Sequence, residues 1–161
     1  MHGESDMLDP VLAAPDDHER RLIYADWLEE HGDPRGDYLR AAMTLEKLEN
    51  EMPAPSQRQR WLNAVDIGRL KRTLRNLATA VDAGWAARIH RGCIQHCNWV
   101  FESYSTGNCP RLWHRLPENS DRFVRHCDQC SRDVWYCQSQ ERLSEALLSR
   151  HPVVLGCTMN R

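Results

Sequence analysis

The first third of the chain carries its apolar residues at helical spacing. Asp16 and Asp17 are suited to cap a first helix, and their charge complements its positive end. Gly32 ends that helix, and Asp33-Pro34 opens a second one, since proline is favoured at the first helical position. Residues 7–52 are therefore predicted to form a helical hairpin. The apolar positions of its first helix share one face among charged neighbours: Leu22, Ile23, Ala25, Trp27 and Leu28.

A second helical pattern covers residues 56–92. Its apolar residues recur at three- and four-residue intervals, and basic residues occupy most of the positions between them. Gly68 and Gly84 are expected to be breaks or joints within it. The pattern predicts a basic helical segment whose apolar positions are Trp61, Leu62, Val65, Leu70, Leu74, Leu77 and Val81.

Strand character replaces helical spacing after about residue 93. Residues 98–104 are rich in aromatic and β-branched side chains, and residues 105–108 form a turn. Residues 123–126 and 134–136 flank a tight turn, which predicts a β-hairpin. A helix is expected from Ser139, its cap, through Leu148, and a short strand follows at 152–155.

These patterns together predict an α+β fold. The N-terminal two-thirds is mostly helical, and a small zinc-ribbon-like hairpin plus helix forms the C-terminal part. The predicted segments are an acidic helical hairpin at 1–55, a basic helical segment at 56–92 and a zinc-binding α+β module at 93–161.

The tip of the predicted hairpin carries Cys127-Asp128-Gln129-Cys130. Two thiolates three residues apart on a tight turn can both face one Zn²⁺ at about 2.3 Å. Cys109, Cys127 and Cys130 are predicted ligands, and the fourth is open between Cys157, which is favoured, and the alternatives Cys137 and His151.

The predicted strand and helix favour some of these candidate fourth ligands over others. An extended strand rising about 3.3 Å per residue would carry Cys137 more than 10 Å from the ion. The helix that follows would bring the chain back by about 15 Å, toward His151 and Cys157. Cys137 is then expected to be a buried thiol. Cys93 and Cys97, four residues apart, are either core thiols or a second site with His90 or His96.

A site closed by four protein ligands is structural, because it leaves no open position for water. The sequence also contains no nucleophile elbow, phosphate loop or H-E-x-x-H pattern. We therefore expect no enzymatic activity.

Composition constrains the surroundings of the protein. The chain has 161 residues and 7 cysteines, an odd count that excludes a fully paired intrachain disulfide set. No apolar run approaches the about 20 residues of a membrane span, and the acidic N-terminus lacks a secretory signal. Because cysteines stay reduced or bind metal inside cells, we expect a cytoplasmic protein with no membrane association.

Charge divides unevenly along the chain. Residues 1–55 carry 14 acidic and 5 basic residues, a net charge of −9, whereas residues 56–125 carry 12 basic and 5 acidic residues, a net charge of +7. The two parts either pack against each other or leave an electropositive surface for nucleic acid or an acidic partner.

Residues 14–40 have the sequence APDDHERRLIYADWLEEHGDPRGDYLR. This stretch, within residues 8–50, resembles the bacterial repeat-companion domain, whose mark is P-D-D followed by R-L-x-Y-A-D-W-L-E-E-x-G-D-P-R-G. The resemblance implies a small helical module of a bacterial protein and no catalytic activity. In that family the module often accompanies repeat arrays, and no such array follows here. Asp26 is expected to order the hairpin through the turn that follows, with Arg35 as its candidate partner.

A second resemblance spans residues 97–158. Cys109-Pro110 with Trp113 and Leu116, then Cys127-Asp128-Gln129-Cys130 and Val134, are similar to a small bacterial zinc-ribbon-like pattern that ends in a helix and a last cysteine. The resemblance implies structural zinc and favours Cys157 as the last ligand.

Two functions follow from the sequence. The first is a zinc-binding adaptor or accessory subunit that docks onto a larger bacterial assembly through protein contacts, and the net charge of −2 favours it. The second is a nucleic-acid-binding accessory protein, in which Trp61, Trp85 and Trp99 stack on bases. Its phosphate contacts would come mainly from the basic segment: Arg58, Arg60, Arg69, Lys71, Arg72 and Arg75.

Overall fold

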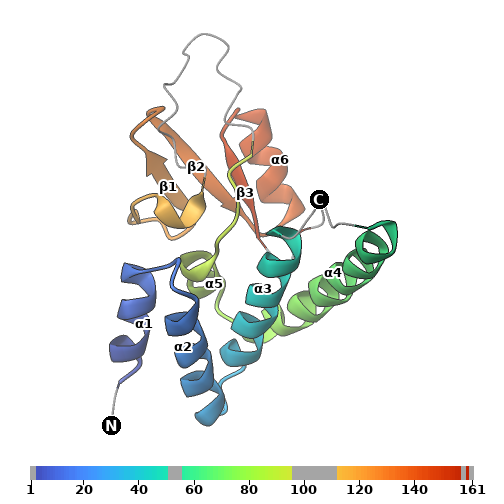
Figure 1. Ribbon diagram of the computed structural model, residues 1–161. Helices are drawn as coiled ribbons and strands as arrows, with labels where there is room; N and C mark the ends of the chain where they lie inside the picture. The colour runs from blue at the N-terminus through green and yellow to red at the C-terminus, as the bar shows by residue number, and fades with distance from the viewer. Residues whose placement is uncertain (1–2, 51–55, 96–111, 157–158, 160–161) are drawn as a thin grey trace. The chain divides into compact units, whose positions relative to one another are not determined.

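The computed structural model describes residues 3–50, 56–95, 112–156 and 159, and the chain divides into two compact units, Met1–Asp82 and Ala83–Arg161 (Figure 1). We refer to them as unit 1 and unit 2. Unit 1 is helical, and unit 2 combines short helices with a three-stranded sheet. The predicted α+β class, mostly helical with a small C-terminal sheet, is confirmed.

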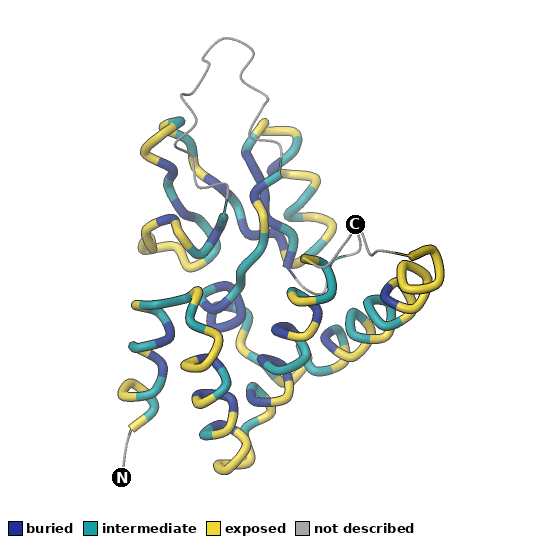
Figure 2. The backbone as a smooth tube through the Cα atoms, in the orientation of Figure 1, coloured by how far each residue is buried: buried dark blue, intermediate teal, exposed yellow. Residues whose placement is uncertain are grey.

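Unit 1 is built from the helices α1 (Glu4–Ala13), α2 (His18–Glu30), α3 (Arg35–Asn50) and α4 (Gln57–Leu77), followed by the 3-10 turn η1 (Ala78–Ala80). α2 packs against both α1 and α3, and α4 packs against α3. Burial follows the helical spacing of the apolar residues, as the dark blue positions of Figure 2 show. The buried apolar residues of these helices are Leu8, Val11, Tyr24, Ala25, Leu28, Tyr38, Leu39, Ala42, Met43, Leu45 and Leu74.

The predicted helical hairpin is present in α2 and α3. Asp17 caps α2, where its side chain accepts from the backbone N–H of Arg20 at 3.1 Å. Gly32 follows the end of α2 with φ +67°, a conformation that glycine adopts without strain. Gly36 allows α3 to approach α2, because a Cβ there would lie 2.7 Å from Glu29 Cγ.

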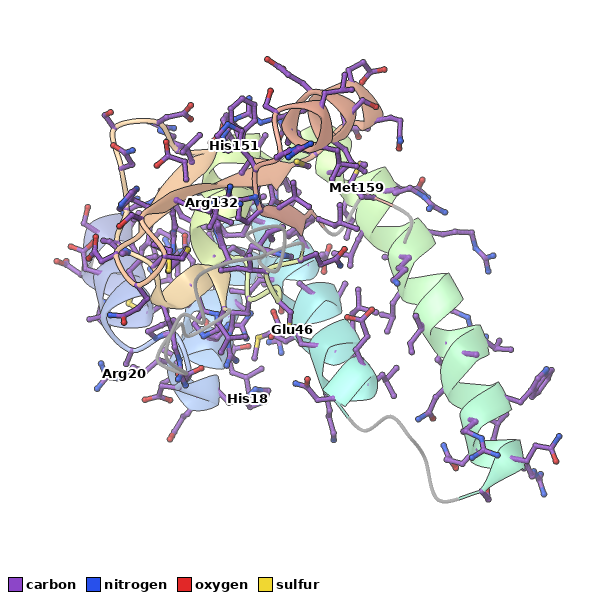
Figure 3. All side chains as sticks on the ribbon, turned by 90° about the horizontal axis from the view of Figure 1, so that it is seen from above. His18, Arg20, Glu46, Arg132, His151 and Met159 are labelled. Carbon is purple, nitrogen blue, oxygen red and sulfur yellow. The ribbon has the colours of Figure 1, made fainter. Side chains whose placement is uncertain are left out.

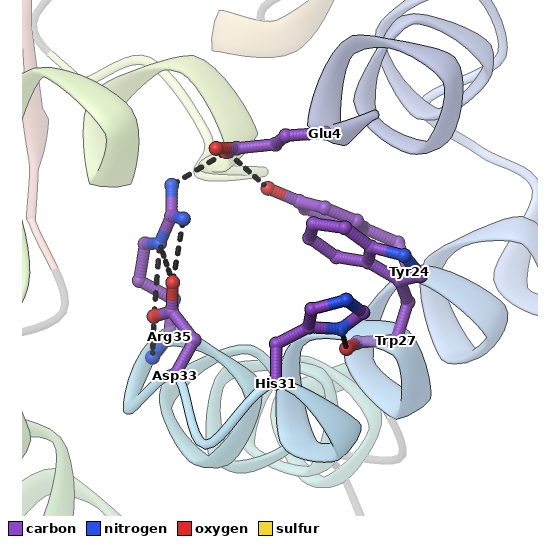
Figure 4. A network of polar contacts seen from close by, with 6 residues as sticks. All are labelled: Glu4, Tyr24, Trp27, His31, Asp33 and Arg35. Atoms are coloured by element: carbon purple, nitrogen blue, oxygen red, sulfur yellow. Dashed lines mark hydrogen bonds and ion pairs between the residues drawn. The ribbon is translucent and has the colours of Figure 1, made fainter. Parts of the chain in front are cut away.

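The turn between α2 and α3 is held by different ion pairs from the one expected. Arg35 pairs with Asp33 at 2.6 Å and with Glu4 of α1 at 2.6 Å (Figure 4). The expected contact between Asp26 and Arg35 is wrong: Asp26 pairs with Arg40 on α3. Asp26 and Arg40 lie on the outer surfaces of adjacent helices, whereas Arg35 begins α3 beside Asp33 and reaches α1.

The aromatic residues of this region complete the packing of the turn. The Tyr24 hydroxyl donates to Glu4 Oε1 at 3.1 Å, which ties α2 to α1. The rings of Trp27 and His31 lie 4.1 Å apart, and His31 Nδ1 is 2.7 Å from the Trp27 carbonyl oxygen (Figure 4). Ion pairs and an aromatic contact therefore both stabilise the turn between α2 and α3.

Unit 1 is expected to lose stability in acid through this network. Hydrogen bonds from Arg35 lower the pKa of both Glu4 and Asp33 below the ordinary values of 4.5 and 3.8. The stabilisation is therefore present above those values and is lost as the pH falls through the lowered ones. Thermal melts across this range should show a steeper acid loss in the wild type than in Arg35→Met. Equal slopes would contradict the prediction.

Helix α4 belongs to unit 1. Leu74 is fully buried, α4 packs against α3, and Lys71 Nζ lies 3.1 Å from Glu49 Oε1 at the end of α3. The helix runs through Gly68, so the break expected there is wrong; the chain leaves the helix at Ala78–Ala80. The sequence predicted one segment over 56–92, whereas the structure divides the chain after Asp82.

Unit 2 begins with α5 (Ala83–Ile89) and continues with η3 (Trp113–Arg115), β1 (Val124–Cys127), β2 (Arg132–Cys137), α6 (Gln140–Leu148) and β3 (Val153–Leu155). β1 and β2 form an antiparallel hairpin, and β3 pairs in parallel with β2 after the crossover through α6. The Ser139 side chain caps α6 by accepting from the Arg142 N–H at 3.3 Å. The predicted hairpin, capped helix and last strand are confirmed, while the predicted strand 98–104 and turn 105–108 lie outside the described residues.

Three isolated bridges extend the strand pairing around a hydrophobic cluster. Gln95 pairs with Val153, Cys93 with Leu112, and Glu118 with Arg125. Trp113 lies fully buried in the cluster and donates from Nε1 to the Ala87 carbonyl at 2.7 Å. The buried members of this cluster, here called the inner cluster, are Ala87, Ile94, Trp113, Leu116, Cys127, Val134, Tyr136 and Val154.

Candidate metal centre

The predicted cysteine pair lies at the turn of the β1–β2 hairpin. Cys127 is the last residue of β1, opposite Arg132, and Cys130 belongs to the turn between the strands. Ser131 closes this turn with φ 50°, a left-handed conformation that reverses the chain sharply. Cys127 is buried in the inner cluster, and Cys130 packs against it. Both cysteines thus contact one cluster from one turn, the arrangement of half a tetrahedral zinc site.

A buried arginine holds a neighbouring segment on the same face of β1. Arg125 lies two residues before Cys127, so their side chains share a face of the strand. Its Nη1 donates to the carbonyls of Trp113 at 2.9 Å and Leu116 at 3.2 Å. Burial lowers the pKa of Arg125, and the nearby Glu118 carboxylate, 3.4 Å away, acts in the opposite direction. The segment after residue 112 is therefore fixed against the strand that carries Cys127.

Cys109 lies outside the described residues, four positions before Trp113. A chain of four residues spans at most about 14 Å. Because Trp113 is anchored on the face that carries Cys127, the position of Cys109 in the sequence is compatible with a shared site.

The polarity of the bridges shows the direction of the chain at Gln95 and at Leu112. Gln95 is antiparallel to β3, with hydrogen bonds to Val153 at 2.7 and 3.0 Å, so the chain leaves Gln95 toward the Arg132 end of the sheet. Leu112 is antiparallel to Cys93, so the chain returns from the same end. At Gln95 the chain therefore runs toward the end of the sheet that carries the Cys127 turn, and at Leu112 it runs away from that end.

Two of the alternative fourth ligands lie on the opposite face of the sheet. Cys137 is fully buried in a second cluster with Ala146 and Val153, against α6. The His151 ring stacks on Trp135 of that face at 4.9 Å, and His151 is labelled in Figure 3. Successive residues of β2 alternate between faces, which separates this cluster from the inner cluster. The sheet therefore separates Cys137 and His151 from the face that carries Cys127.

The Cys137 thiol has the environment of a core residue. Its burial raises the pKa of the thiol, and the neighbouring Arg142 offsets this only in part. A raised pKa disfavours the thiolate that a metal requires. The Cys137 Sγ instead lies 3.7 Å from the Trp135 carbonyl oxygen.

Cys157 is outside the described residues, but the residue before it is not. The Gly156 N–H donates to the Cys137 carbonyl at 2.8 Å. Because β2 runs from Arg132 to Cys137 at about 3.3 Å per residue, Gly156 lies about 16 Å along the sheet from the Cys127 turn. As expected, the helix α6 returns the chain to the beginning of β3. β3 then runs parallel to β2, away from the Cys127 turn.

The expected second site is only partly within the described residues. Cys93 is exposed and pairs through its backbone with Leu112, while Cys97 and His96 lie outside them. The His90 ring makes an edge contact with Tyr136 at 5.2 Å. Across the described part of the chain, no three His, Cys, Asp or Glu side chains gather to hold a metal ion.

The six basic residues proposed for nucleic-acid binding all lie on α4, but on different sides of it. Lys71 faces α3, where it pairs with Glu49. Arg58, Arg69 and Arg72 are exposed and, at 100° per residue, share the side of α4 that faces away from the buried Leu74. Arg60 and Arg75 lie outside this group.

No family model, curated protein or solved structure matches this chain. The resemblances to the repeat-companion domain and to a zinc-ribbon pattern therefore stay predictions. None of the helices that the structure describes combines the length and the apolar character needed to cross a membrane.

Proposed function

We propose that unit 2 binds a structural zinc ion and that the chain serves as a non-catalytic adaptor attached to a larger protein assembly. The observation that carries the proposal is the placement of Cys127 and Cys130 on one turn, against one cluster. The chain directions at Gln95 and Leu112 also support it, because both relate to the end of the sheet that carries this turn, and the sequence between them contains Cys97 and Cys109.

The ligand set that the sheet register supports differs in one member from the one predicted from sequence. Cys109 remains the third ligand. For the fourth, the register favours Cys97, two residues after Gln95, over Cys157, which follows Gly156 at the far end of the sheet. A Cys₄ set satisfies zinc with four thiolates and leaves no position for a reacting water.

The adaptor role rests on the combination of the two units. A small sheet with short strands gains rigidity from a metal that ties its turn to the preceding segment. Residues 8–50 of unit 1 resemble a helical module without catalytic activity, and residues 1–55 carry a net charge of −9. The reduced thiols that the site needs are consistent with the cytoplasm as the working compartment.

Metal analysis of the purified, untagged chain tests the proposal. We expect a single zinc ion per chain. Cys127→Ser should abolish stoichiometric binding, because the turn must supply the thiolates of both Cys127 and Cys130. Cys137→Ser is the matched control, since it removes a buried thiol of the same module on the opposite face. Absence of metal from the wild type, or equal loss in the control, would reject the site.

A second pair of variants decides the fourth ligand. Cys97→Ser is expected to weaken zinc retention in a competition assay with a chromophoric chelator, whereas Cys157→Ser should retain the ion as the wild type does. The reverse result would identify Cys157 as the fourth ligand and leave the proposed zinc site itself in place.

A further inference from the structure

The apolar surface of unit 1 is concentrated on two helices. Among the described residues of this unit, four large apolar side chains are exposed: Ile23 on α2 at 49%, and Trp61, Leu62 and Val65 on α4 at 66%, 39% and 41%. A single exposed leucine needs no explanation, but an exposed tryptophan beside two aliphatic residues forms a patch. Such patches on monomers commonly mark interaction sites.

The patch on α4 is part of a continuous stripe. The residues Arg58, Leu62, Val65, Arg69 and Arg72 recur at alternating spacings of four and three, which places them along one side of the helix with Trp61 beside them. The stripe faces away from the buried Leu74 and Asn63. Figure 3 shows side chains projecting from this long helix into solvent. We call this set the α4 stripe.

The outer side of α2 carries a complementary stripe. Glu19, Ile23, Asp26 and Glu30 recur at spacings of four, three and four, and all four are exposed. Asp26 is already paired with Arg40, so Glu19 and Glu30 supply the uncompensated charge at the two ends. We call this set the α2 stripe. Its apolar centre is Ile23, flanked by carboxylates.

The two stripes match in length as well as in charge. Arg58 and Arg69 are separated by eleven residues, and so are Glu19 and Glu30. At 1.5 Å per residue both pairs span about 16 Å. An arginine can therefore meet a glutamate at each end while Ile23 contacts Leu62 or Val65 between them, in either helix direction. Asp26 then lies opposite the other of these two residues and keeps its ion pair with Arg40.

A symmetric contact between the α4 stripes of two chains is unfavourable. Such a contact would bring arginines against arginines at both ends of the apolar patch, and like charges across an interface are repelled. Within one chain, the α4 stripe points away from α3, the helix that α4 packs against. An acidic, partly apolar helix has the charge and the apolar surface that complement the α4 stripe.

We propose that the α4 stripe docks on the α2 stripe of a second copy of this chain. The contact joins two different surfaces, so it associates chains head to tail. One helix pair buries less than the about 1,600 Å² of a standard interface, so the association is weak and depends on concentration. It does not depend on the metal site of unit 2.

Sedimentation of the full chain, as purified with its metal, tests the proposal. At low ionic strength the weight-average mass should rise with protein concentration. At a salt concentration that shortens the Debye length to about 3 Å it should return to that of a monomer. The double variant Arg58→Glu/Arg69→Glu should weaken association by about tenfold or more, because it sets carboxylates against carboxylates.

Mixing two variants with reversed charges provides the decisive test of the proposed contact. Glu19→Lys/Glu30→Lys alone should weaken association to a similar extent, but an equimolar mixture of the two double variants should associate as the wild type does, since each reversed stripe then meets an opposite charge. Arg60→Glu is the matched control: it changes the same charge on an exposed residue of α4 outside the stripe, and association should persist.

Three outcomes would overturn the proposal. They are a wild type that is monomeric at every concentration, association that survives both double variants, and a mixture that stays monomeric. A labelled single-stranded oligonucleotide is included as a probe. If it binds the monomeric chain and Arg58→Glu/Arg69→Glu abolishes that binding, the α4 stripe is a nucleic-acid surface instead.

Discussion

Removal of zinc by a strong chelator is expected to unfold unit 2 while unit 1 stays folded. Structural zinc in small domains supplies an apparent binding free energy of about 10–16 kcal/mol, which becomes folding free energy. The short strands of unit 2 form a sheet of only three strands, a size near the lower limit of independent stability. Unit 1 has its own core and contains none of the cysteines.

The measurement combines circular dichroism with limited proteolysis. After chelation, the helical signal of unit 1 should persist with a separate melting transition, and cleavage should concentrate after residue 82. Cys127→Ser should reproduce this state without chelator, and Cys137→Ser should respond to chelator as the wild type does. A melting curve that the chelator leaves unchanged would contradict both the prediction and the proposed zinc site.

Local sequence rules were sufficient for the elements but not for their pairing. Asp17 and Ser139 cap the helices where the sequence predicts, because a side-chain acceptor beside an apolar repeat is a local property. The hairpin at Cys127 follows from the same kind of rule. Each of these features depends on residues within a few positions of one another.

The position of Gly156 could not be predicted in this way. The return of the chain through α6 was expected, but the direction of β3 depends on its parallel pairing with β2, a contact between distant residues. The bridges of Gln95 and Leu112 are likewise non-local. These pairings, rather than cysteine spacing, change which cysteine is favoured as the fourth ligand.

Two features of unit 1 differ in whether the sequence could predict them. The sequence predicts one set of apolar positions on α4 with basic residues between them, yet Trp61, Leu62 and Val65 are exposed on a face that they share with arginines, away from the buried Leu74. The helical period alone distinguishes these exposed apolar residues from Leu74, because at 100° per residue they lie on opposite sides of the helix. The burial of Arg21, by contrast, has no local cause, because it depends on Glu46 twenty-five residues away.

Loss of the ion pair between Arg21 and Glu46 is expected to destabilise unit 1 strongly. Arg21 is 1% exposed, and its two terminal nitrogens donate to Glu46 at 2.6 and 3.0 Å. Glu46→Gln keeps the shape of the side chain but leaves a buried cation without its counter-charge, which costs about 3 kcal/mol or more. Domains are stable by only about 5–15 kcal/mol, so the unit 1 transition should fall well below that of the wild type.

The matched control is Arg40→Ala on the same pair of helices. Arg40 pairs with Asp26 and Glu29 at the surface, where such contacts contribute about 0–1 kcal/mol. The double variant Arg21→Met/Glu46→Leu should recover most of the loss, because it removes both buried charges and retains apolar packing. Chemical denaturation of the unit 1 transition measures all three. If Glu46→Gln costs no more than Arg40→Ala, the buried charge is being compensated by another group. If the double variant is as unstable as Glu46→Gln, the loss comes from packing rather than from the uncompensated charge of Arg21.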